Sequence, residues 1–255
     1  MNVFELGNRG PIVLLLHGIP SAASDLRPLG EALAARHRVL IPELPGYGAS
    51  SSLGDFSFDR IGEALAAMVR ARGAEPVRAI IGFSGGAYRA FDLVLRRGIQ
   101  ADKLISISGT AGLDADARAR FRGFAELIRA QPAVVATADM RAMFAATMLS
   151  PAWREAHPRD CDRVADWMSL IAPLDFAAEL AAVGEMPDLR PLLSQLRCEV
   201  YQRVGELDPG CPPSANDELV RLVPAIHLDI VPGCGHALLI EDAAATIARI
   251  VEVIG

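Results

Sequence analysis

Lysine is scarce in this sequence, and acidic residues outnumber basic ones, 31 to 25. The formal net charge of the 255 residues is −6 at pH 7, and Lys103 is the only lysine. No basic stripe is available to follow a phosphate backbone, so the sequence predicts no nucleic-acid partner. Nothing in it indicates a membrane partner either.

Long hydrophobic runs are also missing. The first residues, MNVFELGNRGPIVLLLHG, contain no basic leader, and the apolar run Ile12–Leu16 is far too short for a signal peptide or a membrane span. We therefore expect a cytoplasmic protein.

Cysteines are few and lack paired spacing. The four are Cys161, Cys198, Cys211 and Cys234, and a chain of this length needs no disulfides, so we expect free thiols. Three of them could be combined with His236 into a zinc site, but the sequence has no CxxC or HExxH pair. It predicts no metal and no other cofactor.

The composition that remains is that of an ordinary globular protein, with 51% hydrophobic and 22% charged residues. Short apolar runs alternate with segments of helical periodicity, which is typical of parallel strands joined by crossover helices. The fold class predicted is α/β, with a doubly wound, mostly parallel sheet. The expected strands are Ile12–Leu16, Val39–Pro42, Val77–Gly82, Leu104–Ser108, Cys198–Val204 and His227–Val231. The expected helices are Asp25–Arg36, Asp59–Arg72, Gly85–Arg97, Pro213–Leu222 and Asp242–Ile254.

The alternation stops after Ser108. From there to Cys198 the pattern is helical, with no convincing strand, which predicts a helical cap inserted over the strand ends. We expect a core formed by residues 1–111 and 191–255 and a cap formed by residues 112–190. The cap helices expected are Ala115–Gln131 and Ala138–Met148.

The strongest motif is Gly82-Phe83-Ser84-Gly85-Gly86, which has the form GxSxG. A strand precedes it and a helix follows at once, which is the context of a nucleophile elbow. The two outer glycines allow the chain to fold back closely around a strained serine. Ser84 is therefore the predicted nucleophile; the alternative is a glycine-rich turn needed only for packing.

A second loop follows the first apolar run, at His17-Gly18-Ile19-Pro20. It lies at the carboxyl end of a strand, where open α/β sheets bind ligands. Acyl transfer requires two N–H donors around the developing oxyanion, one from this loop and one from the residue after the nucleophile. We assign them to the backbone amides of Ile19 and Gly85, and we expect the His17 ring to brace the loop.

A serine nucleophile needs a base, usually a histidine oriented by a carboxylate. Two late strands end in Gly205-Glu206-Leu207-Asp208 and in Pro232-Gly233-Cys234-Gly235-His236. We predict His236 as the base and Asp208 as the acid, with Glu206 as the rival acid. The alternative for His236 is a loop residue that only caps the last helix.

Together these residues resemble the α/β-hydrolase superfamily, in particular its small capped members with an HGxP loop. The chain order serine, aspartate, histidine agrees with that resemblance, and so does the segment LIPELPGYGASS, where Glu43 replaces the usual aspartate and is taken as structural. Gly85 departs from the bulkier residue common after the nucleophile, which could widen the acyl pocket. The short N-terminus leaves room for one of the two antiparallel strands that usually begin the fold.

The resemblance implies that Ser84 attacks a carbonyl and that His236 then activates water to hydrolyse the acyl-enzyme. The expected substrate is a carboxylic ester or lactone, small to medium in size and apolar. Ala237 follows the base where plant-type hydroxynitrile lyases have lysine, which disfavours cyanohydrin cleavage. A C–C bond hydrolase, a biosynthetic cyclase or lyase, and a non-catalytic small-molecule receptor remain alternatives. In the first two, Arg190 or an arginine of the cap could bind a substrate carboxylate.

The side chains expected to line the substrate pocket are Phe83, Met143, Trp153 and Trp167. Tryptophan and methionine at helical spacing are more often packing residues, so filling the interface between cap and core is the competing interpretation of the last three. The sequence leaves the oligomeric state open.

Overall fold

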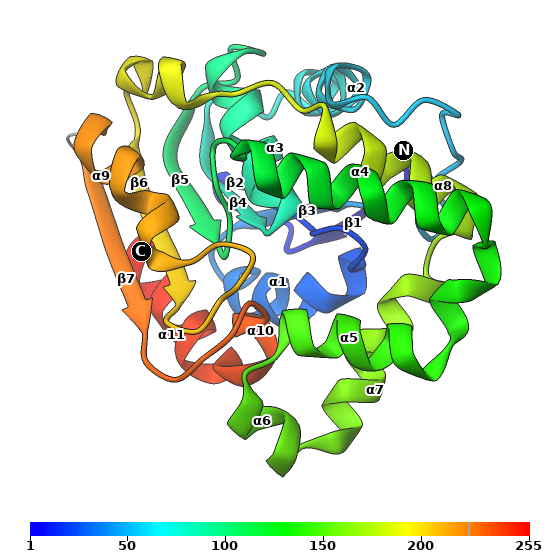
Figure 1. Ribbon diagram of the computed structural model, residues 1–255. Helices are drawn as coiled ribbons and strands as arrows, with labels where there is room; N and C mark the ends of the chain where they lie inside the picture. Colours follow the sequence, from blue (N-terminus) through cyan, green and yellow to red (C-terminus); the bar gives the residue numbers. More distant parts are fainter. Residues whose placement is uncertain (224) are drawn as a thin grey trace.

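A seven-stranded sheet forms the centre of the computed structural model, which describes residues 1–223 and 225–255 (Figure 1). The strands are β1 (Val3–Leu6), β2 (Ile12–Leu16), β3 (Arg38–Pro42), β4 (Val77–Phe83), β5 (Ala101–Ile107), β6 (Glu199–Gly205) and β7 (Ile226–Val231). Their order is β1-β3-β2-β4-β5-β6-β7. Only β1 runs antiparallel, against β3. This confirms the predicted fold class, and β1 is the single N-terminal antiparallel strand for which the sequence left room.

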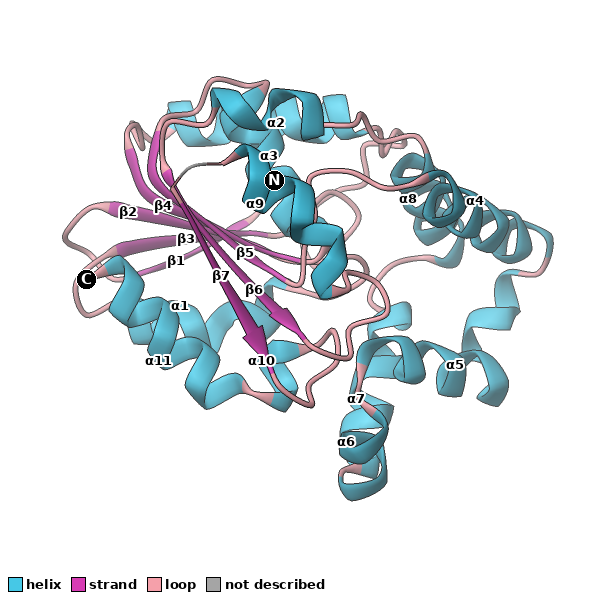
Figure 2. Ribbon diagram, turned by 60° about the vertical axis from the view of Figure 1, so that its left-hand side comes forward, coloured by secondary structure: helices cyan, strands magenta, loops and turns pink. Residues whose placement is uncertain are grey.

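The sheet is covered on both faces, which explains why most residues of its inner strands are buried. All five residues of β2 are buried. Figure 2 shows helices on the two sides of the sheet. One side carries α1 (Arg27–Leu33) and α11 (Ala243–Ile254), and the other carries α2 (Phe58–Ala71), α3 (Gly85–Leu95) and α9 (Asp217–Leu222).

Most differences from the predicted elements lie at their ends. The segment expected as one helix over Asp25–Arg36 begins as the 3₁₀ turn η1 (Ala23–Leu26) and continues as α1; likewise Pro213–Leu222 divides into η5 (Pro213–Asn216) and α9. A short helix, α10 (Leu238–Glu241), precedes α11 and was not predicted. Strand β5 begins three residues early, because its first three residues are partly or fully exposed and give no apolar run.

Between β5 and β6 the chain forms five α-helices, which we call the cap helices. They are α4 (Ala115–Ala130), α5 (Ala138–Met148), α6 (Pro151–Ala156), α7 (Pro158–Asp166) and α8 (Pro173–Gly184). Three begin at a polar side chain that accepts a backbone N–H of the first turn, namely Asp114, Thr137 and Ser150. Figure 2 shows the cap helices beyond the carboxyl ends of β6 and β7, with α4 and α8 side by side.

Among residues 1–223 and 225–255, no single helix is both long and apolar enough to cross a membrane. One bent pair, Pro158–Ser169 with Pro173–Gly184, reaches that length and composition only when its two arms, set 91° apart, are taken together. All four cysteines are free.

Candidate active site

The turn between β4 and α3 presents Ser84 in a strained backbone conformation. Its φ is 53° and its ψ −119°, a region that a residue with a side chain rarely adopts. A Cβ at Gly82 would lie 2.3 Å from the Gly86 backbone, and one at Gly86 would lie 2.2 Å from the Leu16 carbonyl oxygen. Both glycines are therefore required for the turn. The N-terminus of α3 starts directly after Ser84 and directs its positive dipole end toward it.

Ser84, His236 and Asp208 form a continuous series of hydrogen bonds. The Ser84 Oγ lies 2.9 Å from His236 Nε2, and His236 Nδ1 lies 2.8 Å from Asp208 Oδ2. An ionised carboxylate can only accept, so Nδ1 carries the ring proton and Nε2 is free to accept the Ser84 hydroxyl proton. His236 and Asp208 are both buried. The arrangement is the one that proton transfer from the serine requires.

Asp208 is held as a carboxylate by its surroundings. Its Oδ1 accepts the backbone N–H groups of Gly210 at 2.8 Å and Cys211 at 2.9 Å. Burial raises the pKa of Asp208, but His236 and these two amides outweigh burial and set the pKa below its ordinary value of 3.8. The rival acid, Glu206, is exposed and accepts the N–H of Gly233. The structure thus joins His236 to Asp208 and directs Glu206 elsewhere.

His17 braces the loop that follows β2, as the sequence predicted. Its Nε2 accepts the Leu44 N–H at 3.0 Å, so the ring proton is on Nδ1, which donates to the Gly18 carbonyl at 2.9 Å. The side chain is fully buried, and burial lowers the pKa of His17 from 6.5 to about 4. A neutral ring with one donor and one acceptor fits both partners.

The loop that carries Ile19 approaches the serine turn at Ser84 and Gly85. In the part of the chain that the structure describes, neither the Ile19 N–H nor the Gly85 N–H has a protein acceptor. Gly18 brings its loop close, because a Cβ there would lie 3.0 Å from the Ser84 Cβ. The space beside Gly85 is not empty: a Cβ would lie 2.9 Å from the Ile19 side chain. A larger side chain at position 85 would therefore meet Ile19, and the expectation of a wider acyl pocket stays a prediction.

Of the side chains predicted to line a pocket, Phe83 lies near the histidine, and Trp167 packs against Phe83. The Phe83 ring centroid is 5.5 Å from that of His236 and 6.2 Å from that of Trp167. Trp153 instead stacks on His157 and donates its indole N–H to Asp160 within the cap helices.

Met143 is also placed differently from the prediction, being 49% exposed on α5. Neither Met143 nor Trp153 is brought to the serine by the contacts described. Both lie on cap helices whose helical spacing is also that of ordinary packing and surface positions.

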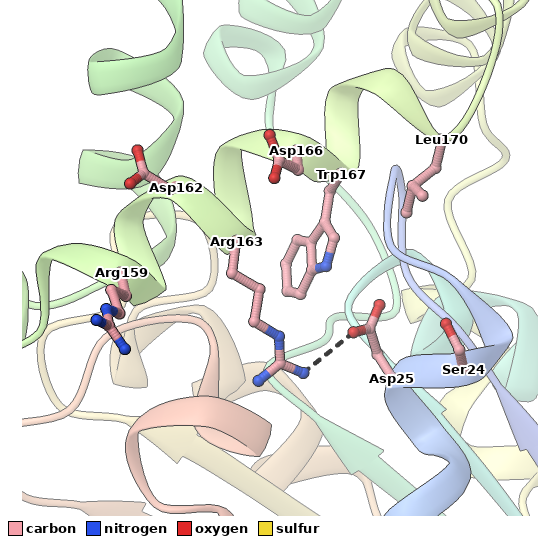
Figure 3. A pocket seen from close by; sticks show the side chains of 8 residues that line it. All are labelled: Ser24, Asp25, Arg159, Asp162, Arg163, Asp166, Trp167 and Leu170. Carbon is pink, nitrogen blue, oxygen red and sulfur yellow. Dashed lines mark hydrogen bonds and ion pairs between the residues drawn. The ribbon is translucent and has the colours of Figure 1, made fainter.

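A surface pocket of about 420 Å³ adjoins Trp167 (Figure 3). It lies between the α7–Leu170 segment and the η1 turn. An ion pair of 3.3 Å between Arg163 and Asp25 joins the two sides. The pocket is therefore bounded by both the cap helices and the core.

A fully buried polar cluster behind the serine turn was not predicted. Glu179 on α8 accepts from Arg89 on α3 at 2.9 Å and from the Tyr47 hydroxyl at 2.5 Å. All three side chains are at most 1% exposed. Burial raises the pKa of Glu179, and the Arg89 guanidinium opposes that rise. The sequence feature that could have indicated this cluster is a glutamate within the mostly apolar segment PLDFAAELAAVG.

The loop that carries His236 is also tied to the cap helices. The Glu241 carboxylate accepts the N–H of Gly235 at 3.1 Å and both the N–H and the hydroxyl of Ser150, at 3.0 Å and 2.5 Å. Ser150 is the N-cap of α6. One buried carboxylate thus connects the end of α5 to the histidine loop.

Two other predicted residues have structural partners. Arg190 forms ion pairs with Asp188 and Glu218 rather than facing the serine. Glu43 accepts from Asn2 and from the Ala49 N–H, so it stabilises its own turn. Within residues 1–223 and 225–255, no group of three or more His, Cys, Asp or Glu side chains is arranged to hold a metal ion.

The sequence matches the profile of the alpha/beta hydrolase family over residues 13–250. It is 26% identical to the pimeloyl-[acyl-carrier protein] methyl ester esterase of Aeromonas salmonicida over 243 residues, which cover 93% of this chain and 92% of that protein. It is 27% identical to polyketide synthase ThaQ of Burkholderia thailandensis over 260 aligned residues, which are 94% of this chain but only 11% of that much longer protein.

Solved structures share the same fold. A thermophilic esterase from Thermogutta terrifontis superposes with a TM-score of 0.88 at 24% identity, covering 99% of this chain and 92% of that one. The enol-lactonase from Burkholderia xenovorans superposes with a TM-score of 0.80 at 17% identity, covering 98% and 95%. At these identities the likeness concerns the arrangement of the chain, not the reaction.

Proposed function

This chain belongs to the alpha/beta hydrolase family, and from that premise we propose that it is a serine hydrolase of carboxylic esters or lactones. Its substrate is a small to medium apolar molecule, and it acts through an acyl-enzyme. The single observation that carries the proposal is the pair of hydrogen bonds from Ser84 Oγ to His236 Nε2, at 2.9 Å, and from His236 Nδ1 to Asp208, at 2.8 Å. A relative at 26% identity along nearly its whole length is named a methyl ester esterase, which supports the same bond type.

In the proposed mechanism, Ser84 Oγ attacks the carbonyl carbon while His236 Nε2 takes the hydroxyl proton. Asp208 stabilises the imidazolium that forms. The Ile19 and Gly85 amides donate to the tetrahedral oxyanion. The C–O bond then breaks and the leaving alkoxide takes the proton from His236. Water, deprotonated by His236, attacks the acyl carbon. The bond from that carbon to Ser84 Oγ then breaks, and His236 returns the proton to Oγ as the acid leaves; with a lactone, acid and alcohol leave as one molecule.

The rings near the site favour an apolar substrate: Phe83 lies beside His236, and Trp167 packs against Phe83. Both rings are almost fully buried, so an apolar acyl chain held beside them is removed from water and gains hydrophobic free energy. We propose that residues 112–190 act as the cap that closes this space, and that the pocket at Arg163 and Asp25 is its outer end (Figure 3).

The test is turnover of p-nitrophenyl acetate, butyrate and octanoate, and of γ-butyrolactone, by the wild type and by Ser84→Ala. Loss of the nucleophile should lower kcat by a factor on the order of 10⁶, and a fluorophosphonate should label Ser84 in the wild type alone. Ser51→Ala, which changes an exposed serine, is the matched control and should behave as the wild type.

If the wild type neither turns over any of these compounds nor reacts with the fluorophosphonate, the enzyme assignment is wrong. The same pocket would then be that of a receptor.

A further inference from the structure

Glu179 accepts from Arg89, which reaches toward Gly85, and from Tyr47, which packs against His17. No step of the reaction uses Glu179. We propose that Glu179 is a positioning residue for the oxyanion hole, acting through Arg89 on the amide of Gly85 and through Tyr47 on the loop of Ile19. This inference rests on the proposed function, because it concerns the donors of that reaction. It also assigns a role to α8, since docking of this cap helix supplies the carboxylate.

The first series of contacts leads from Glu179 through Arg89 to Gly85, along α3. The Arg89 guanidinium donates to Glu179 at 2.9 Å and reaches back toward the Gly85 carbonyl, 3.5 Å away. It also lies over the Phe58 ring, 4.7 Å from the centroid. A Cβ on Gly85 would be only 3.4 Å from Arg89 Nη1. The charged head is thus fixed directly beside the residue whose N–H is the proposed donor.

The second series of contacts leads from Glu179 through Tyr47, in the loop after β3, to His17. The Tyr47 hydroxyl donates to the other oxygen of Glu179 at 2.5 Å, and the Tyr47 ring packs edge-on against His17 with centroids 4.8 Å apart. His17 in turn donates to the Gly18 carbonyl, one residue before Ile19. Moving Glu179 would therefore loosen the brace on the second donor.

A purely stabilising role does not account for this cluster. Replacing a buried ion pair by apolar side chains of similar volume is often neutral or stabilising. The Arg89 Nε also has no hydrogen-bond partner among the described residues, so the cluster is not optimised for its own stability. One carboxylate that accepts two hydrogen bonds fixes the directions of both donors, and apolar packing cannot do this. Oxyanion donors depend on direction, because they must meet the charge as it develops.

A matched pair of variants tests the proposal. Glu179→Gln removes the charge but keeps the shape. Asp92→Asn does the same to a second buried carboxylate, on α3. Asp92 is 1% exposed and pairs with Arg96 and Arg97, which follow the end of the helix. Three properties are measured for both variants: thermal unfolding, hydrolysis of p-nitrophenyl butyrate, and inhibition by butylboronic acid. The boronic acid forms a tetrahedral adduct with serine.

Both variants should unfold at a lower temperature. Only Glu179→Gln should lower kcat, by about tenfold, as expected for donors moved by a fraction of an ångström. Its KM should stay within about twofold, and its affinity for the boronic acid should fall by the same factor as kcat. Asp92→Asn should keep wild-type kcat and inhibition.

The double variant Arg89→Met/Glu179→Met separates position from stability, and it covers the case in which Glu179→Gln does not fold. It should unfold at a higher temperature than Glu179→Gln while kcat stays low. Tyr47→Phe, which keeps the ring on His17 but removes the donor, should lower kcat by a smaller factor.

The proposal is overturned if the double variant has wild-type kcat, or if Asp92→Asn loses kcat and boronic-acid affinity as much as Glu179→Gln. These results differ from failure of the proposed function. In that case the wild type itself would show neither turnover nor labelling of Ser84.

Discussion

A carboxylate that orients a histidine must accept a hydrogen bond, and this gives Asp208→Asn a definite expected effect. Oδ1 already accepts two backbone N–H groups, so the new amide would keep its oxygen there and turn its NH₂ toward His236. Nδ1 would then have to accept, and Nε2 would carry the proton and could not take one from Ser84. We expect kcat to fall by about 10⁴-fold.

Glu206→Gln is the control for that prediction. Glu206 was the rival acid in the sequence and is two residues away, but it contacts Gly233. Its kcat should stay within about twofold of the wild type. A large loss in Glu206→Gln together with a small loss in Asp208→Asn would reverse the assignment of the acid.

His17 should make stability depend on pH. In the folded protein its pKa is lowered to about 4, whereas the ordinary value is 6.5. As pH falls below 6.5 the unfolded chain binds a proton that the folded chain does not, so stability decreases on acidification and the loss is complete near pH 4. From pH 7 to pH 5 this contributes about 2 kcal/mol to the decrease in the free energy of unfolding.

Urea unfolding at the two pH values measures the effect. His17→Asn keeps a donor near the Gly18 carbonyl but removes the titrating ring and its packing. It should be less stable than the wild type at pH 7, and its free energy of unfolding should decrease by about 2 kcal/mol less between pH 7 and pH 5. His157→Asn changes an exposed histidine and should keep the wild-type slope. An unchanged slope in His17→Asn would show that the buried ring is not the cause.

At the scale of elements, the predictable parts are those that local sequence determines. Ser84, Asp208 and His236 each follow the carboxyl end of a parallel strand; β4 is mostly apolar and buried, whereas β7, at the sheet edge, is largely accessible to solvent. Parallel strands bring those ends to one edge, so the grouping could be inferred before any coordinates. Helix ends were less predictable, because a 3₁₀ turn such as η1 has the same composition as a first helical turn.

Glycines in two elements should respond oppositely to alanine. Gly86→Ala would place a Cβ 2.2 Å from the Leu16 carbonyl oxygen, so β2 and α3 would have to separate, which should destabilise the protein by about 3 kcal/mol. Gly123 lies inside α4, is exposed, and a Cβ there meets nothing within 4 Å. Gly123→Ala should therefore stabilise it by about 1 kcal/mol, because alanine is the better helix former.

Denaturant unfolding of both variants checks the pair. If Gly86→Ala were as stable as the wild type, the nucleophile turn would tolerate a side chain, and the close approach of β2 to α3 would no longer explain the GxSxG pattern.

At the scale of the whole molecule, the contacts between cap helices and core could not be read from the sequence. Glu179 meets Tyr47 and Arg89, 132 and 90 residues away, and Glu241 meets Ser150 91 residues away. No local periodicity encodes such pairs. The same limit explains the outcome for the pocket: Trp153 and Trp167 are equivalent as sequence features, and only the path of the cap helices separates them.

That difference leads to a prediction on substrate length. Trp167 lies between Phe83 and the pocket of about 420 Å³, so Trp167→Ala should join that pocket to the space beside His236. Burying two more methylenes of an acyl chain at about 0.8 kcal/mol each corresponds to about tenfold. The ratio of kcat/KM for p-nitrophenyl octanoate to that for the acetate should rise by about this factor, at a cost of about 3–5 kcal/mol in stability.

Trp153→Ala removes the same side chain from a site where it stacks on His157, so it should destabilise the cap helices without changing the octanoate to acetate ratio. Because both variants lose an indole, a change in the ratio for Trp167→Ala alone would be due to position and not to looser packing. A ratio that rises equally in both would mean that general loosening of the cap helices admits the longer chain. Trp167 would then be a packing residue like its counterpart.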